Sequence, residues 1–348
     1  MGRHVAGEMP ELDRLVEESC AEIGAEIGAL RIPRLAGVVL GGGYGRGEGG
    51  AMASALSNDL DFFAITEDGA PEAESVASIG AALEPVSKRW KERLGVDVDF
   101  AVKTPWRLKH DEARLMVQEL VHGYYDVAGA KGETLFAGIE RREPAELPPG
   151  EATRLLMNRG MGLLLAKGKM ESAKCKVGEA ANESGSAAAE CRMSPERDFI
   201  NRNINKCVLG AGDARLIANG AYRWKAEDRA AALGDSLYAA AVEWKFRPRA
   251  FPVCNWEAAR TVWLSAEEEV GRAVSTKPPK SGGIIDAALP GRRTLRNALR
   301  WVVRRRTFGG ISTFGLPPEL RVLRKVAAAI RDRSGVTPEL RRDWEVFN

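Results

Sequence analysis

The sequence contains few of the residues on which many enzyme chemistries depend. Only three histidines occur among 348 residues, so catalysis by a Ser-His or Cys-His pair is not favoured. The five cysteines are scattered and form no C-x-x-C pair, which argues against a disulfide framework and against a zinc site. No apolar run approaches the ~20 residues that cross a bilayer, and acidic residues interrupt the N-terminus where a signal peptide needs an apolar core. We therefore expect a cytoplasmic protein with no membrane partner.

The sequence also has no large excess of charge of either sign, because 51 basic residues are nearly balanced by 48 acidic ones. The net charge of +3 neither demands nor excludes a nucleic-acid partner. The length suffices for two domains or one large one. A stretch rich in Pro and Glu over residues 141–151 is a candidate boundary. We expect a catalytic domain over 1–140 and a mostly helical C-terminal domain over 150–348.

The hydrophobic pattern of the first 140 residues alternates between helical and strand periods. This pattern predicts an α+β fold, in which helices pack on a compact sheet. The expected elements are helices over 10–30, 70–94 and 107–122, and strands over 36–40, 60–65, 96–102 and 133–138.

After residue 150 the pattern is mostly helical. Two stretches rich in small residues, Gly or Pro are expected to be loops, over 171–196 and 275–291. The expected helices cover 152–167, 197–220, 226–247, 255–274, 292–306 and 317–333.

A run of glycines comes directly after the first strand. Gly41, Gly42 and Gly43 allow the backbone to approach a ligand closely, and their N–H groups can form a nest for phosphates. The spacing matches neither the dinucleotide fingerprint nor a P-loop. A glycine-rich loop by itself is as often only a turn. Its meaning therefore depends on the residues that come after it.

Two pairs of aspartates lie beyond the glycines. Asp59 and Asp61 are two residues apart on an expected strand, so their carboxylates share a face and repel each other unless a cation lies between them. Asp97 and Asp99 repeat this spacing on the next strand. If the strands are neighbours, three or four hard oxygen ligands converge, as a Mg²⁺ or Mn²⁺ centre for phosphoryl transfer requires. Alternatively, the aspartates are solvated strand ends, or charges that protect an edge strand from aggregation.

These motifs, in this order, resemble the DNA polymerase β-type nucleotidyltransferase superfamily. The string over residues 42–48 is similar to the loop of the bacterial PII uridylyltransferases, and the resemblance covers about residues 36–102. It implies a nucleotidyltransferase-type mixed sheet with flanking helices. It also implies that Gly42 and Gly43 face the triphosphate of an NTP.

The resemblance assigns roles to the aspartates as well. Asp59 and Asp61 would ligate both metals. A third carboxylate on the later strand would bind one metal and take the proton from the acceptor hydroxyl. Asp99 is the preferred candidate, because three apolar residues come after it as they do after Asp61, and Asp97 is a near-equal alternative.

Other residues of the loop are candidates for contact with the nucleotide. Tyr44 and Arg46 lie within it; Arg46 either touches a phosphate or pairs with Glu48 to hold the loop, and we favour the pairing. The spacer from Tyr44 through Asn58 holds 15 residues. It is longer than is usual for the family by an insertion around 49–56. The longer loop either carries acceptor specificity or is merely slack.

The sequence thus predicts a magnesium-dependent nucleotidyltransferase. It would move a nucleoside monophosphate from an NTP such as ATP to a hydroxyl of a small molecule or protein. One alternative is an enzyme that acts on RNA 3′ ends, in which the seven arginines of residues 292–306 would contact phosphates. No RNA-recognition signature supports it. Another is a non-catalytic, antitoxin-like member that binds nucleotide without turnover, although every carboxylate of the motif is present.

Overall fold

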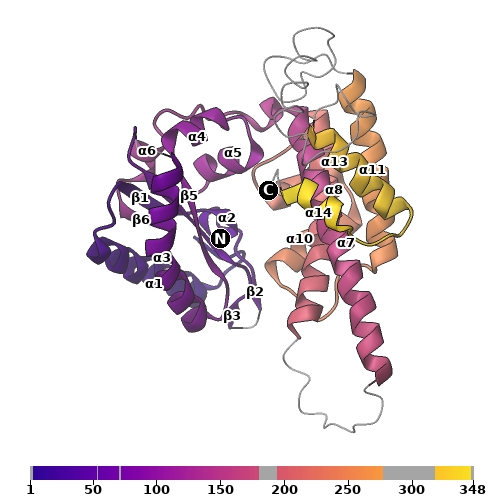
Figure 1. The fold of residues 1–348 in the computed structure, drawn as a ribbon, viewed down its shortest axis with the longest axis horizontal. Coiled ribbons are helices and arrows are strands. Elements are labelled where there is room, and N and C mark those ends of the chain that lie inside the picture. The colour runs from indigo at the N-terminus through magenta and orange to yellow at the C-terminus, as the bar shows by residue number, and fades with distance from the viewer. Residues whose placement is uncertain (1–2, 53, 70–71, 180–193, 277–317, 346–348) are drawn as a thin grey trace. The chain divides into compact units, whose positions relative to one another are not determined.

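The structure is a computed structural model that describes residues 3–52, 54–69, 72–179, 194–276 and 318–345. The chain divides into two compact units (Figure 1). The first unit contains Met1–Glu143 together with two short later segments, Trp224–Ala226 and Lys245–Pro248. The remaining residues form the second unit. No helix in the described ranges combines the length and the apolar character that a membrane crossing needs.

The described residues of the first unit form a four-stranded sheet with the order β5-β4-β1-β6. Strand β1 is antiparallel to β4 and to β6, whereas β4 and β5 are parallel. The sheet is therefore mixed, and the prediction of an α+β fold is confirmed at this level. The strands are β1 (Leu35–Leu40), β4 (Leu60–Thr66), β5 (Val98–Lys103) and β6 (Tyr125–Gly129).

Helices cover both faces of this sheet (Figure 1). Along β4, Phe62 packs with the helices α1 and α3 on one face, and Ile65 packs with α4 and α5 on the other. This alternation is the period of two that a strand buried on both faces requires. The helices are α1 (Pro10–Leu30), α3 (Glu72–Leu94), α4 (Pro105–His110) and α5 (Leu115–His122), and two single turns are α2 (Gly42–Gly45) and α6 (Gly132–Leu135).

Two local predictions in the first unit were wrong. The strand expected over 133–138 is instead the turn α6 and its continuation, and the last strand is β6. The helix expected over 107–122 is broken into α4 and α5 near Asp111, whose carboxylate pairs with Arg107 and Arg114. The insertion after the glycines, for which no structure was predicted, contains the antiparallel strands β2 (Ala51–Met52) and β3 (Ala55–Leu56).

The second unit is built from helices in its described part. Helix α7 packs against α8, α11 and α13. The indoles of Trp256 and Trp263 on α11 each donate a hydrogen bond to a carbonyl of α7, at 2.9 Å to Leu163 and Leu156. The helices are α7 (Pro149–Glu179), α8 (Pro195–Asn219), α9 (Ala226–Leu233), α10 (Ser236–Phe246), α11 (Trp256–Thr276), α13 (Pro318–Arg331) and α14 (Pro338–Glu345), after a 3-10 turn at Pro144–Glu146.

The bounds of two predicted helices differ from those in the structure, and one helix was not predicted. Helix α7 continues to residue 179 through a segment rich in Lys, Ala and Glu, so the expected loop is wrong over 171–179, and residues 180–193 lie outside the described residues. The helix expected over 226–247 is divided at Gly234, which adopts a positive φ of 64°. Helix α14 was not predicted. The arginine-rich residues 292–306 lie outside the described residues.

Candidate functional site

The register of two neighbouring strands brings the aspartates together. Asp61 of β4 is the direct register partner of Asp99 of β5. Their neighbours Leu60 and Val98 are fully buried in the core beneath α1 and α3, so the two carboxylates project from the opposite face. Asp59 lies two residues before Asp61, directly before β4 begins at Leu60, and is half-buried. Asp61 and Asp99 thus lie side by side near the start of these parallel strands, and Asp59 directly precedes the first of them.

The pKa of Asp99 reflects the negative charge that is gathered here. Partial burial raises the pKa of Asp99, and the charges of Asp97 and Asp59 raise it further, while Lys91 acts in the opposite direction. Carboxylates that disfavour each other's ionisation in this way mark a place where a cation is stabilised.

Asp97 is already paired with a lysine side chain. Its carboxylate forms an ion pair with Lys91 of α3, and this hydrogen bond raises the pKa of the lysine. About half of the Asp97 side chain is exposed. The sequence left Asp97 and Asp99 as alternatives for the third carboxylate. The strand register and the ion pair together favour Asp99.

The chemistry of these donors suits a hard divalent cation such as Mg²⁺ or Mn²⁺, since all are carboxylate oxygens. Within the described residues, however, no group of three or more His, Cys, Asp or Glu side chains is arranged closely enough to hold a metal ion. The site therefore fits a divalent cation only in the type of its donor atoms and in the shared face of Asp61 and Asp99.

The glycine turn packs directly against one of these carboxylates. The N–H of Gly41 donates to the backbone oxygen of Asp61 at 2.8 Å. Gly42 has a φ of +59°, and a Cβ atom there would lie 2.1 Å from Oδ2 of Asp61. Only glycine meets both conditions. As the first residues of the turn α2, Gly42 and Gly43 have N–H groups that the helix's own hydrogen bonds do not use.

Tyr44 points into the protein. Its side chain is only 1% exposed, so a direct contact with a nucleotide is not supported. The hydroxyl donates to the backbone oxygen of Gly50 at 2.7 Å and accepts from the N–H groups of Ser57 and Asn58 at 3.3 and 3.4 Å. The backbone oxygen of Tyr44 accepts from Nδ1 of His4 at 3.1 Å. The structure therefore indicates that Tyr44 supports the backbone of the loop through these hydrogen bonds.

Arg46 and Glu48 lie in a network of charges beneath the loop. Arg46 lies 3.3 Å from the carboxylate of Glu119 and 3.7 Å from that of Glu48. The buried carboxylate of Glu48 accepts hydrogen bonds from the N–H of Ala226 and from Nζ of Lys245, both at 2.6 Å. All five residues belong to the first unit. This network supports the interpretation that Arg46 holds the loop.

Sequence patterns contained no signal for two of these contacts. Ala226 and Lys245 lie 178 and 197 residues after Glu48, beyond any local pattern. His4 was not singled out either, since a histidine near a chain end carries no pattern of its own. Lys91 was placed on the expected helix over 70–94 but was not connected with Asp97.

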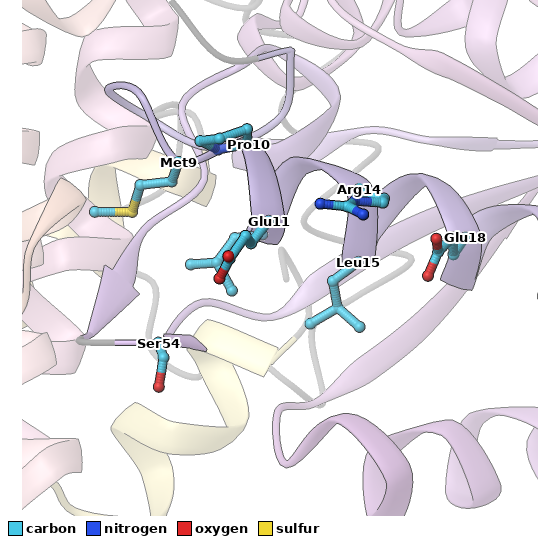
Figure 2. Close-up of a pocket in the computed structure, with 8 residues that line it drawn as sticks. Met9, Pro10, Glu11, Arg14, Leu15, Glu18 and Ser54 are labelled. Atoms are coloured by element: carbon cyan, nitrogen blue, oxygen red, sulfur yellow. The ribbon is translucent and has the colours of Figure 1, made fainter.

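A separate groove of about 730 Å³ lies between the first turns of α1 and Ser54, beside the hairpin β2–β3 (Figure 2). Its lining includes none of the aspartates or glycines described above. The residues that line it are Met9, Pro10, Glu11, Leu12, Arg14, Leu15, Glu18 and Ser54.

Comparison of the chain with protein-family models finds no match, and comparison with curated proteins finds none either. The function must therefore be argued from the carboxylates and the glycine turn.

Proposed function

We propose that this protein is a magnesium-dependent nucleotidyltransferase that moves a nucleoside monophosphate from an NTP to a hydroxyl of a small molecule or protein. One observation carries the proposal: Asp61 and Asp99 are register partners on parallel strands, and the glycine turn packs on Asp61. The chain order also agrees with the resemblance, because a strand and a glycine turn are followed by Asp59, a strand that contains Asp61, a helix, and a strand that contains Asp99.

Each part of the site has a role in this reaction. Asp59, Asp61 and Asp99 would hold the cation, which when bound neutralises charge on the phosphates. The N–H groups of Gly42 and Gly43 would face the triphosphate. Asp99 would accept the proton of the acceptor hydroxyl, for which a raised pKa suits a carboxylate. Positioning and electrostatics would supply most of the rate, as in phosphoryl transfer generally.

The test is incubation of the full chain with each labelled NTP, Mg²⁺ and a cell extract, followed by measurement of pyrophosphate and identification of the labelled acceptor. Asp61→Asn and Asp99→Asn should each lower transfer by about 10²- to 10³-fold. Asp97→Asn is the matched control, since Asp97 pairs with Lys91, and it should keep most of the activity. Wild-type transfer by a folded Asp61→Asn variant would refute the mechanism.

The same experiment separates the two alternatives. An enzyme of RNA 3′ ends would place the label on RNA, with an affinity that falls steeply as salt rises. A non-catalytic member would bind NTP in a Mg²⁺-dependent manner and release no pyrophosphate over hours.

A further inference from the structure

We propose that a strip on the surface of the first unit binds single-stranded nucleic acid, with bases stacked on two tryptophan–histidine pairs and phosphates beside the cations between them. The inference goes beyond the proposed function and does not rest on it, because neither the aspartates nor a metal ion takes part. The residues of this strip, which we call the α4–α5 strip, are Trp106, Arg107, Lys109 and His110 of α4, His122 at the end of α5, Arg142 and Trp224.

Helix α4 presents one of these pairs to solvent in a fixed orientation. The hydroxyl of Thr104 caps the helix by accepting from the N–H of Arg107 at 3.1 Å, and Leu108 anchors it in the core. Trp106 and His110 are four residues apart, so they share one face of the helix. Trp106 is 60% exposed, and its ring lies on that of His110 with centroids 5.2 Å apart and planes inclined by only 8°.

The fold makes little use of this indole. Trp106 donates no hydrogen bond from its indole nitrogen to another of the described residues, whereas five other tryptophans donate one to a protein oxygen. His110 covers one side of the ring, so the exposed area lies on the other side and at the edge, where a base can stack. The five hydrogen-bonded indoles are those of Trp90, Trp244, Trp256, Trp263 and Trp344.

A second stack lies at the end of α5. The rings of His122 and Trp224 have centroids 4.4 Å apart and planes inclined by 21°. Contacts between side chains connect this stack with the first: Lys109 pairs with Glu112 at 2.6 Å, and Glu112 lies 3.9 Å from Arg142. Nε2 of His122 in turn donates to the backbone oxygen of Arg142 at 3.0 Å. Two stacks with cations between them suit the bases and phosphates of one strand.

The ion pairs of α4 leave positive charge on the outside. Arg107 pairs with Asp111, and the exposed fractions of the two side chains are 43% and 8%. Lys109 pairs with Glu112, with exposed fractions of 57% and 20%. In both pairs the carboxylate lies inside and the cation outside. A phosphate that approaches the strip therefore meets the cations first.

The aromatic rings favour nucleic acid over an acidic peptide. An acidic peptide would gain from the cations alone, whereas a nucleotide gains from the stacking of its base as well. Near the second stack the positive charge is partly balanced, because Arg142 also pairs with Glu140, whose side chain is 64% exposed. Stacking on Trp224 must therefore supply more of the binding there.

The experiment measures binding of the full chain to a fluorescent oligodeoxythymidine of about 12 nucleotides by anisotropy, without NTP or divalent metal. Trp106→Ala should raise the dissociation constant about tenfold, and Trp106→Phe, which keeps a flat ring, by less than about threefold. A strand of equal length and charge without bases should bind the wild type at least about tenfold more weakly. Urea denaturation checks that each variant is folded.

Lys109→Gln tests the contribution of charge, and Lys88→Gln is its matched control. Both lysines are exposed and pair with a glutamate within one helical turn, Glu112 and Glu84. Lys88 belongs to α3, which covers the other face of the sheet. Lys109→Gln should weaken binding by about two- to fivefold and reduce the slope of log affinity against log salt by about 0.7. Lys88→Gln should change neither quantity.

Three results would overturn the inference. One is the absence of binding up to about 100 μM protein, the weak end of non-specific affinities. Another is equal affinity of Trp106→Ala and the wild type, or of the strands with and without bases, since charge alone would then hold the strand. The third is a polyglutamate peptide that binds as tightly as the oligonucleotide and is unaffected by Trp106→Ala, which would assign the strip to acidic peptides.

These results are independent of the proposed function. Asp61→Asn should bind the oligonucleotide as the wild type does, because its carboxylate is not part of the strip, while its nucleotidyl transfer falls. Failure of the oligonucleotide to bind leaves the proposed transfer standing. Wild-type transfer by Asp61→Asn overturns the proposed function and leaves the strip unaffected.

Discussion

At the scale of single residues, a glycine of the turn packs closely against a carboxylate of the site. Gly42→Ala would place a methyl group 2.1 Å from Oδ2 of Asp61, at a φ of +59° that disfavours alanine. We expect the left-handed backbone to cost about 1–2 kcal/mol of stability. Displacement of Asp61 should lower nucleotidyl transfer by about 100-fold. Urea denaturation and initial rates measure the two effects separately.

A variant of a second glycine distinguishes the effect of backbone strain from the effect of displacing Asp61. Gly69 has a φ of +73°, and a Cβ atom there would meet no atom within 4 Å. Gly69→Ala should therefore show a similar loss of stability with unchanged transfer. If both variants lost activity equally, contact between Gly42 and Asp61 would not be the cause.

At the scale of elements, the N-terminal segment is held by hydrogen bonds to the first turns of α1. The carboxylate of Asp13 accepts hydrogen bonds from the backbone N–H groups of Arg3, His4 and Val5, at 3.2, 2.8 and 2.8 Å. The ring of His4 is buried, and its Nδ1 must carry the proton, because the oxygen of Tyr44 can only accept. Nε2 of His4 has no hydrogen-bond partner among the described residues. The N-terminal segment is thus fixed in its position against the glycine loop.

This arrangement predicts a loss of stability in mild acid. Burial lowers the pKa of His4 below its ordinary value of 6.5. As the pH falls below 6.5, the unfolded chain takes up a proton that the folded chain does not, so the free energy of unfolding decreases until the folded-state pKa is reached. Thermal denaturation over a series of pH values on both sides of this ordinary value should show the decrease.

The control for this prediction is His4→Asn, whose amide can still donate to Tyr44. Its stability should fall less with pH than that of the wild type. A residual dependence is expected from His122, since burial also lowers its pKa. An identical pH dependence in the variant and the wild type would contradict the role assigned to His4.

The sequence predicted those elements whose signal is local. Strands β1, β4 and β5 were expected from short apolar or alternating runs, and the alternation placed Asp59 and Asp61 on one face. Strand β6 was missed because it has only five residues and completes the sheet by pairing with β1, which is distant in the chain. The choice between Asp97 and Asp99 depended on the register and on Lys91, neither of which is a local property.

At the scale of the whole molecule, Glu48 joins segments that are distant in the chain. Its side chain is 7% exposed, and Lys245 is its ion-pair partner at 2.6 Å. Glu48→Gln removes the negative charge of this mostly buried ion pair, and we expect a loss of about 3 kcal/mol in the free energy of unfolding. Lys245→Met in the same chain should recover part of it. A double-mutant cycle in urea measures the coupling, and additive effects would show that the pair contributes nothing.

The partners of Glu48 have a consequence for synthesis of the protein. A chain that grows from its N-terminus has made all four strands of the sheet once Gly129 is complete. The carboxylate beneath the glycine loop has neither Ala226 nor Lys245 at that moment. While the ribosome makes the intervening helices, the sheet can form around a loop that still lacks both contacts. The loop therefore gains its final support late, when the segment containing Lys245 returns to the first unit.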